Sequence, residues 1–99
     1  MNSENVGLLA RLEAKPGKEK DLETFLKGAL PLAQQEAFTN RWYAIKLAPN
    51  VFGIFDTFAD DAGRQKHLSG PIAAALMAKA SELLTNPPQI DKIDILANK

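Results

Sequence analysis

The chain contains one histidine and no cysteine, so few side chains can move a proton near neutral pH. His67 has an ordinary pKa of about 6.5, which makes it the obvious proton acceptor. Asp56 lies in an apolar segment, where a carboxyl group has to be paired or hydrogen-bonded, and a raised pKa would make it a second acceptor. These two residues predict proton-transfer chemistry. The alternatives are that His67 caps a helix at the surface and that Asp56 pairs with Arg11 or Arg41.

Aromatic residues gather in the segment that precedes this histidine. Residues 41–58 hold the only Trp, the only Tyr and three of the five Phe. Aromatic side chains beside one imidazole indicate a small apolar pocket with a proton-transfer group at its rim. Ordinary packing within a sheet is the alternative for each aromatic residue. The residues expected to contact a substrate are Trp42, Tyr43, Phe55, Asn40, Arg41 and Ser69, with Asn40 and Ser69 as donors to an oxyanion.

Periodicity and turn residues place these side chains on four strands and three helices. Alternating apolar residues predict the first strand, and β-branched and aromatic runs on either side of a Pro-Asn turn predict a hairpin. Pro31 interrupts the apolar stripe of the first helix and is expected to kink or re-cap it. The predicted strands cover 6–14, 41–46, 51–58 and 90–97, and the helices begin at about 18, 61 and 71, the last two ending near 68 and 84.

The order strand-helix-strand-strand-helix-strand is that of a ferredoxin-like, split βαβ fold of the α+β class. It predicts an antiparallel four-stranded sheet with the helices on one face, in a single domain over residues 1–99. The strand 51–58 is apolar on both faces, and a chain of this length cannot easily cover both. We therefore expect a homodimer that forms through the open face of the sheet.

Charge and composition exclude several classes of function. Twelve basic and twelve acidic residues give no net charge, which argues against nucleic acid as a partner. The absence of cysteine excludes a disulfide scaffold and a thiolate metal site, and one histidine with scattered carboxylates does not make a zinc or iron site. The polar first residues and the absence of a long apolar run predict a cytoplasmic protein without membrane contact.

Two motifs, together with the order of elements, resemble one known family. Lys15-Pro16-Gly17 leads into the first helix, and the strand 52–58 leads to Gln65-Lys66-His67-Leu68-Ser69-Gly70-Pro71. With these features the chain resembles the antibiotic biosynthesis monooxygenase domain family, which includes the quinol monooxygenases. The resemblance covers nearly the whole chain. It implies a dimeric α+β barrel, in which two such sheets pack face to face.

The resemblance further implies a cofactor-independent monooxygenase that acts on a small aromatic or quinol-type substrate. His67 would abstract a proton, and the resulting electron-rich anion would reduce oxygen without flavin, haem or metal. Haem-degrading relatives carry a histidine in the long helix, and here the segment 72–80 has none. A non-oxidative isomerase with His67 as base and a non-catalytic small-molecule-binding dimer remain alternatives. An RNA-binding module does not fit, because the basic residue that opens its aromatic strand motif is absent.

Overall fold

The computed structural model describes residues 3–99, which form four strands and four helices in the order β-α-α-β-β-α-α-β. The split of the first predicted helix into two accounts for the additional helix. None of these helices combines the length and the apolar character needed to cross a membrane. The elements are β1 (Val6–Glu13), α1 (Glu19–Gly28), α2 (Leu30–Gln35), β2 (Arg41–Ala48), β3 (Val51–Phe58), α3 (Asp61–Leu68), α4 (Pro71–Leu83) and β4 (Gln89–Asp94).

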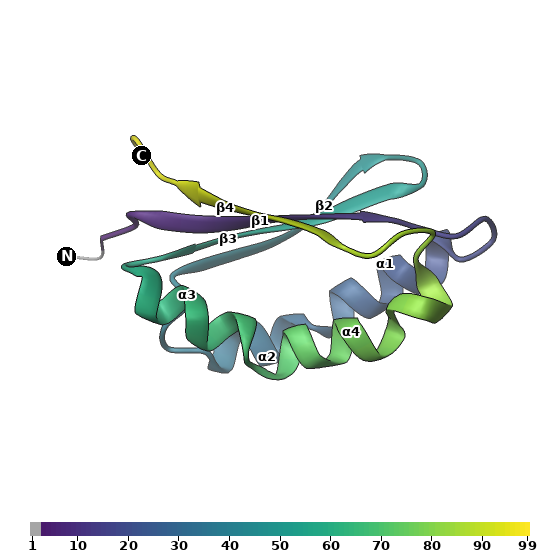
Figure 1. Ribbon diagram of the computed structural model, residues 1–99, viewed down its shortest axis with the longest axis horizontal. Helices are drawn as coiled ribbons and strands as arrows, with labels where there is room; N and C mark the ends of the chain where they lie inside the picture. Colours follow the sequence, from purple (N-terminus) through teal and green to yellow (C-terminus); the bar gives the residue numbers. More distant parts are fainter. Residues whose placement is uncertain (1–2) are drawn as a thin grey trace.

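The strands form one antiparallel sheet in the order β2-β3-β1-β4. Figure 1 shows the helices on one side of this sheet, with its other side uncovered. This arrangement confirms the predicted ferredoxin-like α+β fold. We call the side that carries the helices the inner face and the uncovered side the outer face.

The core lies between the inner face and the helices. Alternate residues of the strands point inward, as the predicted period of two requires, and they meet the apolar stripes of α1 and α4. Leu12 of β1 and Leu22 of α1 are completely buried at this contact. The buried apolar residues of the main cluster are Ala10, Leu12, Ala14, Leu22, Leu26, Phe52, Ile54, Leu76, Leu83 and Leu84.

The outer face presents an apolar row that no helix covers. Leu9 pairs with Phe55, which pairs with Tyr43 on the edge strand β2. The rings of Tyr43 and Phe55 stack with their centroids 6.2 Å apart, and Tyr43 is 46% exposed. The strand 51–58, which was predicted to be apolar on both faces, therefore does present apolar side chains to the outer face as well as to the core.

Pro31 divides the predicted first helix into α1 and α2. Proline has no N–H and is tolerated in the first turn of a helix, and Pro31 lies in the first turn of α2. The break lets α2 turn toward α4, where Ala29 and Ala33 pack against Ile72. As a result, the chain leaves α2 at Glu36, beside α3.

Four strand ends differ from the sequence-based boundaries, and two of them, the ends of β2 and β4, differ by more than one residue. β2 extends to Ala48, because a bulge between Lys46 and Ala48 lets the pairing with β3 continue to the turn. β4 ends at Asp94 and not at Ala97. Asp94 is paired with Val6, the first residue of β1, so the chain beyond it has no partner strand to extend along.

Candidate functional site

The single histidine lies between two carboxylates inside the protein. His67 is in the last turn of α3 and is 5% exposed. Its Nδ1 atom lies 2.7 Å from Oε1 of Glu36, and its Nε2 atom lies 3.0 Å from Oδ2 of Asp56. Asp56 comes from β3 and Glu36 from the end of α2. We call His67, Asp56 and Glu36 the buried triad.

Contacts made by neighbouring residues hold the triad in place. The carboxylate of Asp60 accepts a 3.0 Å hydrogen bond from the N–H of Gly63, which fixes the start of α3 and the side on which His67 lies. The ring of Phe58, at the end of β3, packs against the imidazole with a centroid distance of 5.4 Å. The hydroxyl of Thr39 donates a 2.8 Å hydrogen bond to Oε1 of Glu36. The imidazole is therefore held by contacts on several sides.

Asp56 is completely buried on the inner face of the sheet. Its contact with His67 is close enough for an ion pair but is not aligned as a hydrogen bond, and both carboxylate oxygens lack a hydrogen-bond partner within residues 3–99. Trp42, its cross-strand neighbour on β2, also has a buried indole Nε1 without a partner in that range. Buried polar atoms are nearly always hydrogen-bonded, so these atoms are suited to a water molecule or a ligand.

Burial and mutual contacts shift the pKa values of Asp56 and His67. Burial raises the pKa of the Asp56 carboxyl; the neighbouring imidazole opposes this shift, and the charge of Glu36 adds to it. Burial alone would lower the pKa of His67, but the contacts with Asp56 and Glu36 outweigh it and raise the pKa. His67 therefore keeps its proton to a higher pH than an exposed histidine, and Asp56 accepts one more readily than an exposed aspartate.

A small apolar cavity lies against Asp56 and His67. Its volume is about 30 Å³, which holds one or two water molecules and is far below the several hundred Å³ typical of ligand pockets. One wall is Ile90, which is 43% exposed and lies on β4, an edge strand with a neighbouring strand on one side only. The other lining residues are Leu8, Ala10, Ile54, Leu68, Ile72, Ala73 and Leu76.

The aromatic pocket expected around His67 is not formed, because strand alternation separates its members. The residues that line the cavity include no aromatic side chain in the part of the chain described. Tyr43 and Phe55 each neighbour an inward residue and so point to the outer face, away from the triad. Trp42 points inward and packs against the core beside Asp56. Of the predicted substrate contacts, the structure brings only Trp42 next to the proton-transfer residues.

The remaining predicted residues have local partners. The Nε–H of Arg41 donates a 3.0 Å hydrogen bond to Glu4. Asp56 pairs with His67, so the alternative of a pair with Arg41 or Arg11 is not what the described residues show. The side-chain amide of Asn40 donates to the carbonyl of Ser3, and the hydroxyl of Ser69 donates to the carbonyl of Gln65 at the end of α3. Their roles toward a substrate stay predictions.

Glu36 is the site residue that the sequence did not indicate. It lies in the polar segment Gln34-Gln35-Glu36-Ala37, where nothing distinguishes it from an exposed acid. The only hint is the proline that ends α1 early and redirects the chain. Within residues 3–99, no group of His, Asp and Glu side chains has the arrangement of a metal site. The two carboxylates of the triad approach the imidazole at different nitrogens, so they do not converge on a shared point.

Comparison with solved structures identifies a similar protein over the whole chain. A protein of unknown function from Nitrosomonas europaea is 55% identical, with a TM-score of 0.97, and the match covers 100% of this chain and 96% of that one. The search against protein-family models returned no match. No curated protein matches the sequence either.

More distant structures share the fold. A candidate antibiotic biosynthesis monooxygenase from Nitrosomonas europaea is 11% identical, with a TM-score of 0.83 over 93% of this chain and 99% of that one. Another from Caulobacter crescentus is 17% identical, with a TM-score of 0.79 over 96% of this chain and 92% of that one. The scaffold of this chain is therefore the one seen in structures that carry this name.

Proposed function

The chain belongs to the same family as the Nitrosomonas europaea protein of unknown function, and from this premise we propose that it is a cofactor-independent monooxygenase of a small aromatic or quinol-type substrate. The observation that supports the proposal is the buried triad at an apolar cavity. A base in a dry site is what a substrate needs in order to become an anion that reduces oxygen. The fold of the candidate monooxygenases adds support at the level of the scaffold.

In this proposal Asp56, and not His67, accepts the first proton from the substrate. Asp56 lines the cavity, carries unpartnered oxygens and has a raised pKa, whereas His67 is held between two carboxylates and keeps its proton. A substrate hydroxyl at the cavity gives its proton to Asp56, and the charged imidazole beside it stabilises the anion that remains. The indole N–H of Trp42 is the candidate donor to the substrate's oxygen.

The electrons and atoms balance without a further reactant. Oxidation of a hydroquinone to a hydroxyquinone consumes one O₂, of which one atom enters the ring and the other leaves as water. The substrate supplies all four electrons. The cavity must widen to admit a ring, and outward movement of Ile90 on the edge strand is the simplest route.

Oxygen uptake tests this function directly. The purified protein, without added flavin or metal, is mixed with a panel of hydroquinones and anthrones in an oxygen-electrode cell. We expect consumption of O₂ above the rate of spontaneous oxidation, with a hydroxyquinone as the product from a hydroquinone and an anthraquinone as the product from an anthrone. Ligand binding without turnover across the panel would instead support the non-catalytic small-molecule-binding dimer.

The size of the cavity favours one second candidate. A volume of about 30 Å³ fits a small carbonyl compound with less rearrangement than a quinol. The same Asp56 could then move a proton between two carbons of such a compound, which makes the protein a non-oxidative isomerase. Exchange of substrate C–H hydrogens with deuterated water, without O₂ uptake, would favour this reaction over the oxygenase.

We also propose that the protein is a homodimer through the outer face. The uncovered Leu9, Phe55 and Tyr43 row supports this, and a stable interface of this kind buries about 1,600 Å² in total. Light scattering is expected to give twice the mass of one chain. Phe55→Glu puts a charge into the row and should give a monomer, whereas Met77→Glu on the exposed side of α4 should not. A wild-type monomer at micromolar concentration would contradict the proposal.

A further inference from the structure

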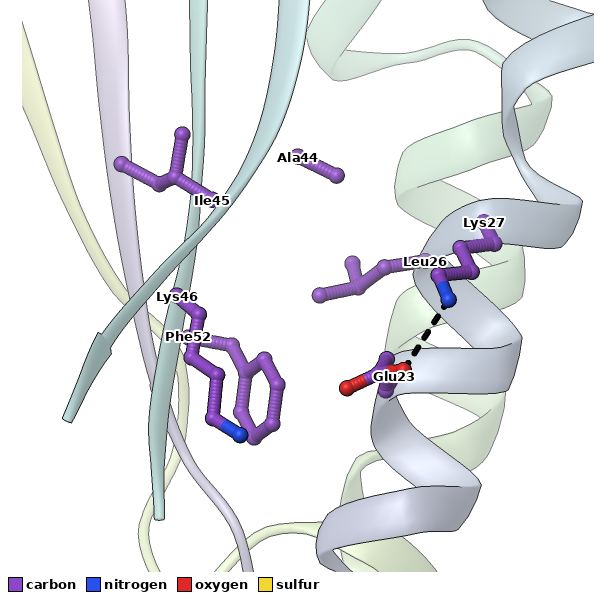
Figure 2. A pocket seen from close by; sticks show the side chains of 7 residues that line it. All are labelled: Glu23, Leu26, Lys27, Ala44, Ile45, Lys46 and Phe52. Atoms are coloured by element: carbon purple, nitrogen blue, oxygen red, sulfur yellow. Dashed lines mark hydrogen bonds and ion pairs between the residues drawn. The ribbon is translucent and has the colours of Figure 1, made fainter. Parts of the chain in front are cut away.

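A second hollow lies between α1 and the edge strand β2, and no triad residue lines it. Figure 2 shows side chains of α1 on one side of this cleft and side chains of the β2–β3 hairpin on the other. The volume is about 260 Å³, close to the lower end of small-molecule pockets. The lining residues are Glu23, Leu26, Lys27, Ala44, Ile45, Lys46 and Phe52.

The floor of the cleft is apolar and its rim is charged. Leu26 and Phe52 form the floor and are 2% and 3% exposed. At the rim, Lys27 donates a 3.0 Å hydrogen bond to the carboxylate of Glu23, so these two charges neutralise each other. Such a surface suits a ligand with a flat or short apolar body.

Lys46 is the charged residue at the rim that remains after Lys27 and Glu23 have paired with each other. Its ammonium lies 5.5 Å from the centroid of the Phe52 ring, and it has no carboxylate within ion-pair distance in residues 3–99. A cation held over an aromatic floor can bind an anion whose apolar part rests on that floor. The cleft therefore has a net positive charge beside an apolar surface.

We propose that the cleft between α1 and β2 binds a small apolar anion, namely an aromatic or short aliphatic carboxylate. The apolar body lies on Leu26 and Phe52, and the carboxylate pairs with Lys46. The site is separate from the proposed oxygenase reaction, because Glu23 is held ionised by Lys27 and none of the lining residues is a base for neutral pH. Binding here does not depend on whether the triad is catalytic.

A titration with benzoate tests the site, and the amide NMR signals of the ¹⁵N-labelled protein report the binding. We expect saturable shifts at residues of the cleft, such as Ala44 and Lys46, with a dissociation constant on the order of 1 mM. Benzamide has the same ring without the charge and should bind at least about fivefold more weakly, as expected for the loss of one ion pair. Residues around His67 should not shift.

Two variants separate the charge from the apolar surface. Lys46→Gln should weaken benzoate binding about fivefold and leave benzamide binding unchanged. Ala44→Leu fills the cleft and should abolish binding of both compounds. Lys79→Gln removes a lysine of α4 that does not line the cleft, and it should bind benzoate like the wild type.

Three results would overturn the inference. The first is equal affinity for benzoate and benzamide, because Lys46 would then play no part. The second is unchanged binding in Ala44→Leu, which would place the ligand elsewhere. The third is a set of shifts confined to Asp56, His67 and their neighbours, because the anion would then occupy the cavity at the triad.

Discussion

Asp56→Asn is expected to lower turnover of a confirmed quinol substrate by roughly 100-fold or more, as for the loss of a general base. The amide has nearly the same shape but cannot accept the proton. The fold should survive, because the Glu36 carboxylate remains 2.7 Å from Nδ1 of His67 and still balances the charge of the imidazole. Rates of oxygen uptake at saturating substrate measure the effect, and circular dichroism checks the fold.

An exposed aspartate on the edge strand β4, which does not pair with β3, provides the control. Asp91→Asn on β4 also removes one negative charge, but Asp91 does not line the cavity, so turnover should be unaltered. Full activity in Asp56→Asn would contradict the assignment of the base. His67 would then be the acceptor, as its type and position in the sequence first suggested.

His67→Gln is expected to reduce the free energy of unfolding by about 3 kcal/mol near pH 6. Removing the cation of a buried ion pair leaves its partners as uncompensated buried charges, which is among the costlier single changes in a protein. The side chains of Asp56 and Glu36 are 1% and 5% exposed, so water cannot replace the imidazole without rearrangement. Urea denaturation of the variant and the wild type gives the difference.

The same histidine sets the sign of the pH dependence. The pKa of His67 is raised in the folded protein, so the native state holds more protons than the unfolded state above about pH 6.5. Its contribution to stability is therefore complete below about pH 6.5 and is lost as the pH rises through the folded-state pKa. The raised pKa of Asp56 acts with the same sign, starting from lower pH.

The wild type should consequently lose stability between pH 6 and pH 9, and His67→Gln should lose much less over that interval. Lys66→Gln, at the exposed neighbouring position on α3, should follow the wild-type curve. Parallel curves for wild type and His67→Gln would show that the imidazole is not coupled to the carboxylates in solution.

The sequence predicted the sheet and helices well because their signals are local or periodic. The alternation of Leu8, Ala10 and Leu12 determines which face of β1 is buried, and Asp60 marks the start of α3 without reference to distant residues. Pro31 likewise predicted a break in the first helix. The largest errors were at strand ends that depend on a partner strand, such as the end of β4.

The site was predicted in part, because its geometry depends on contacts between distant elements. His67 and Asp56 stood out by residue type, and they do lie together. Tyr43 and Phe55 are separated from them because successive residues of a strand point to opposite faces of the sheet. The sequence shows this alternation, but the register of the sheet is needed to tell which face carries the site. Glu36 reaches His67 through a turn between α2 and β2, and no periodic pattern encodes that approach.

The position of β1 has a consequence for how the chain reaches its fold. β1 pairs with β3 on one side and with β4 on the other, and only β2 and β3 are joined by a tight turn. Closing the β1–β4 pair joins opposite ends of the polypeptide, which costs more loop entropy than any local contact. Such topology is associated with slow folding among small domains. During synthesis, the edge of β1 that faces β4 must therefore remain unpaired until β4 has been made, even when β3 is already available.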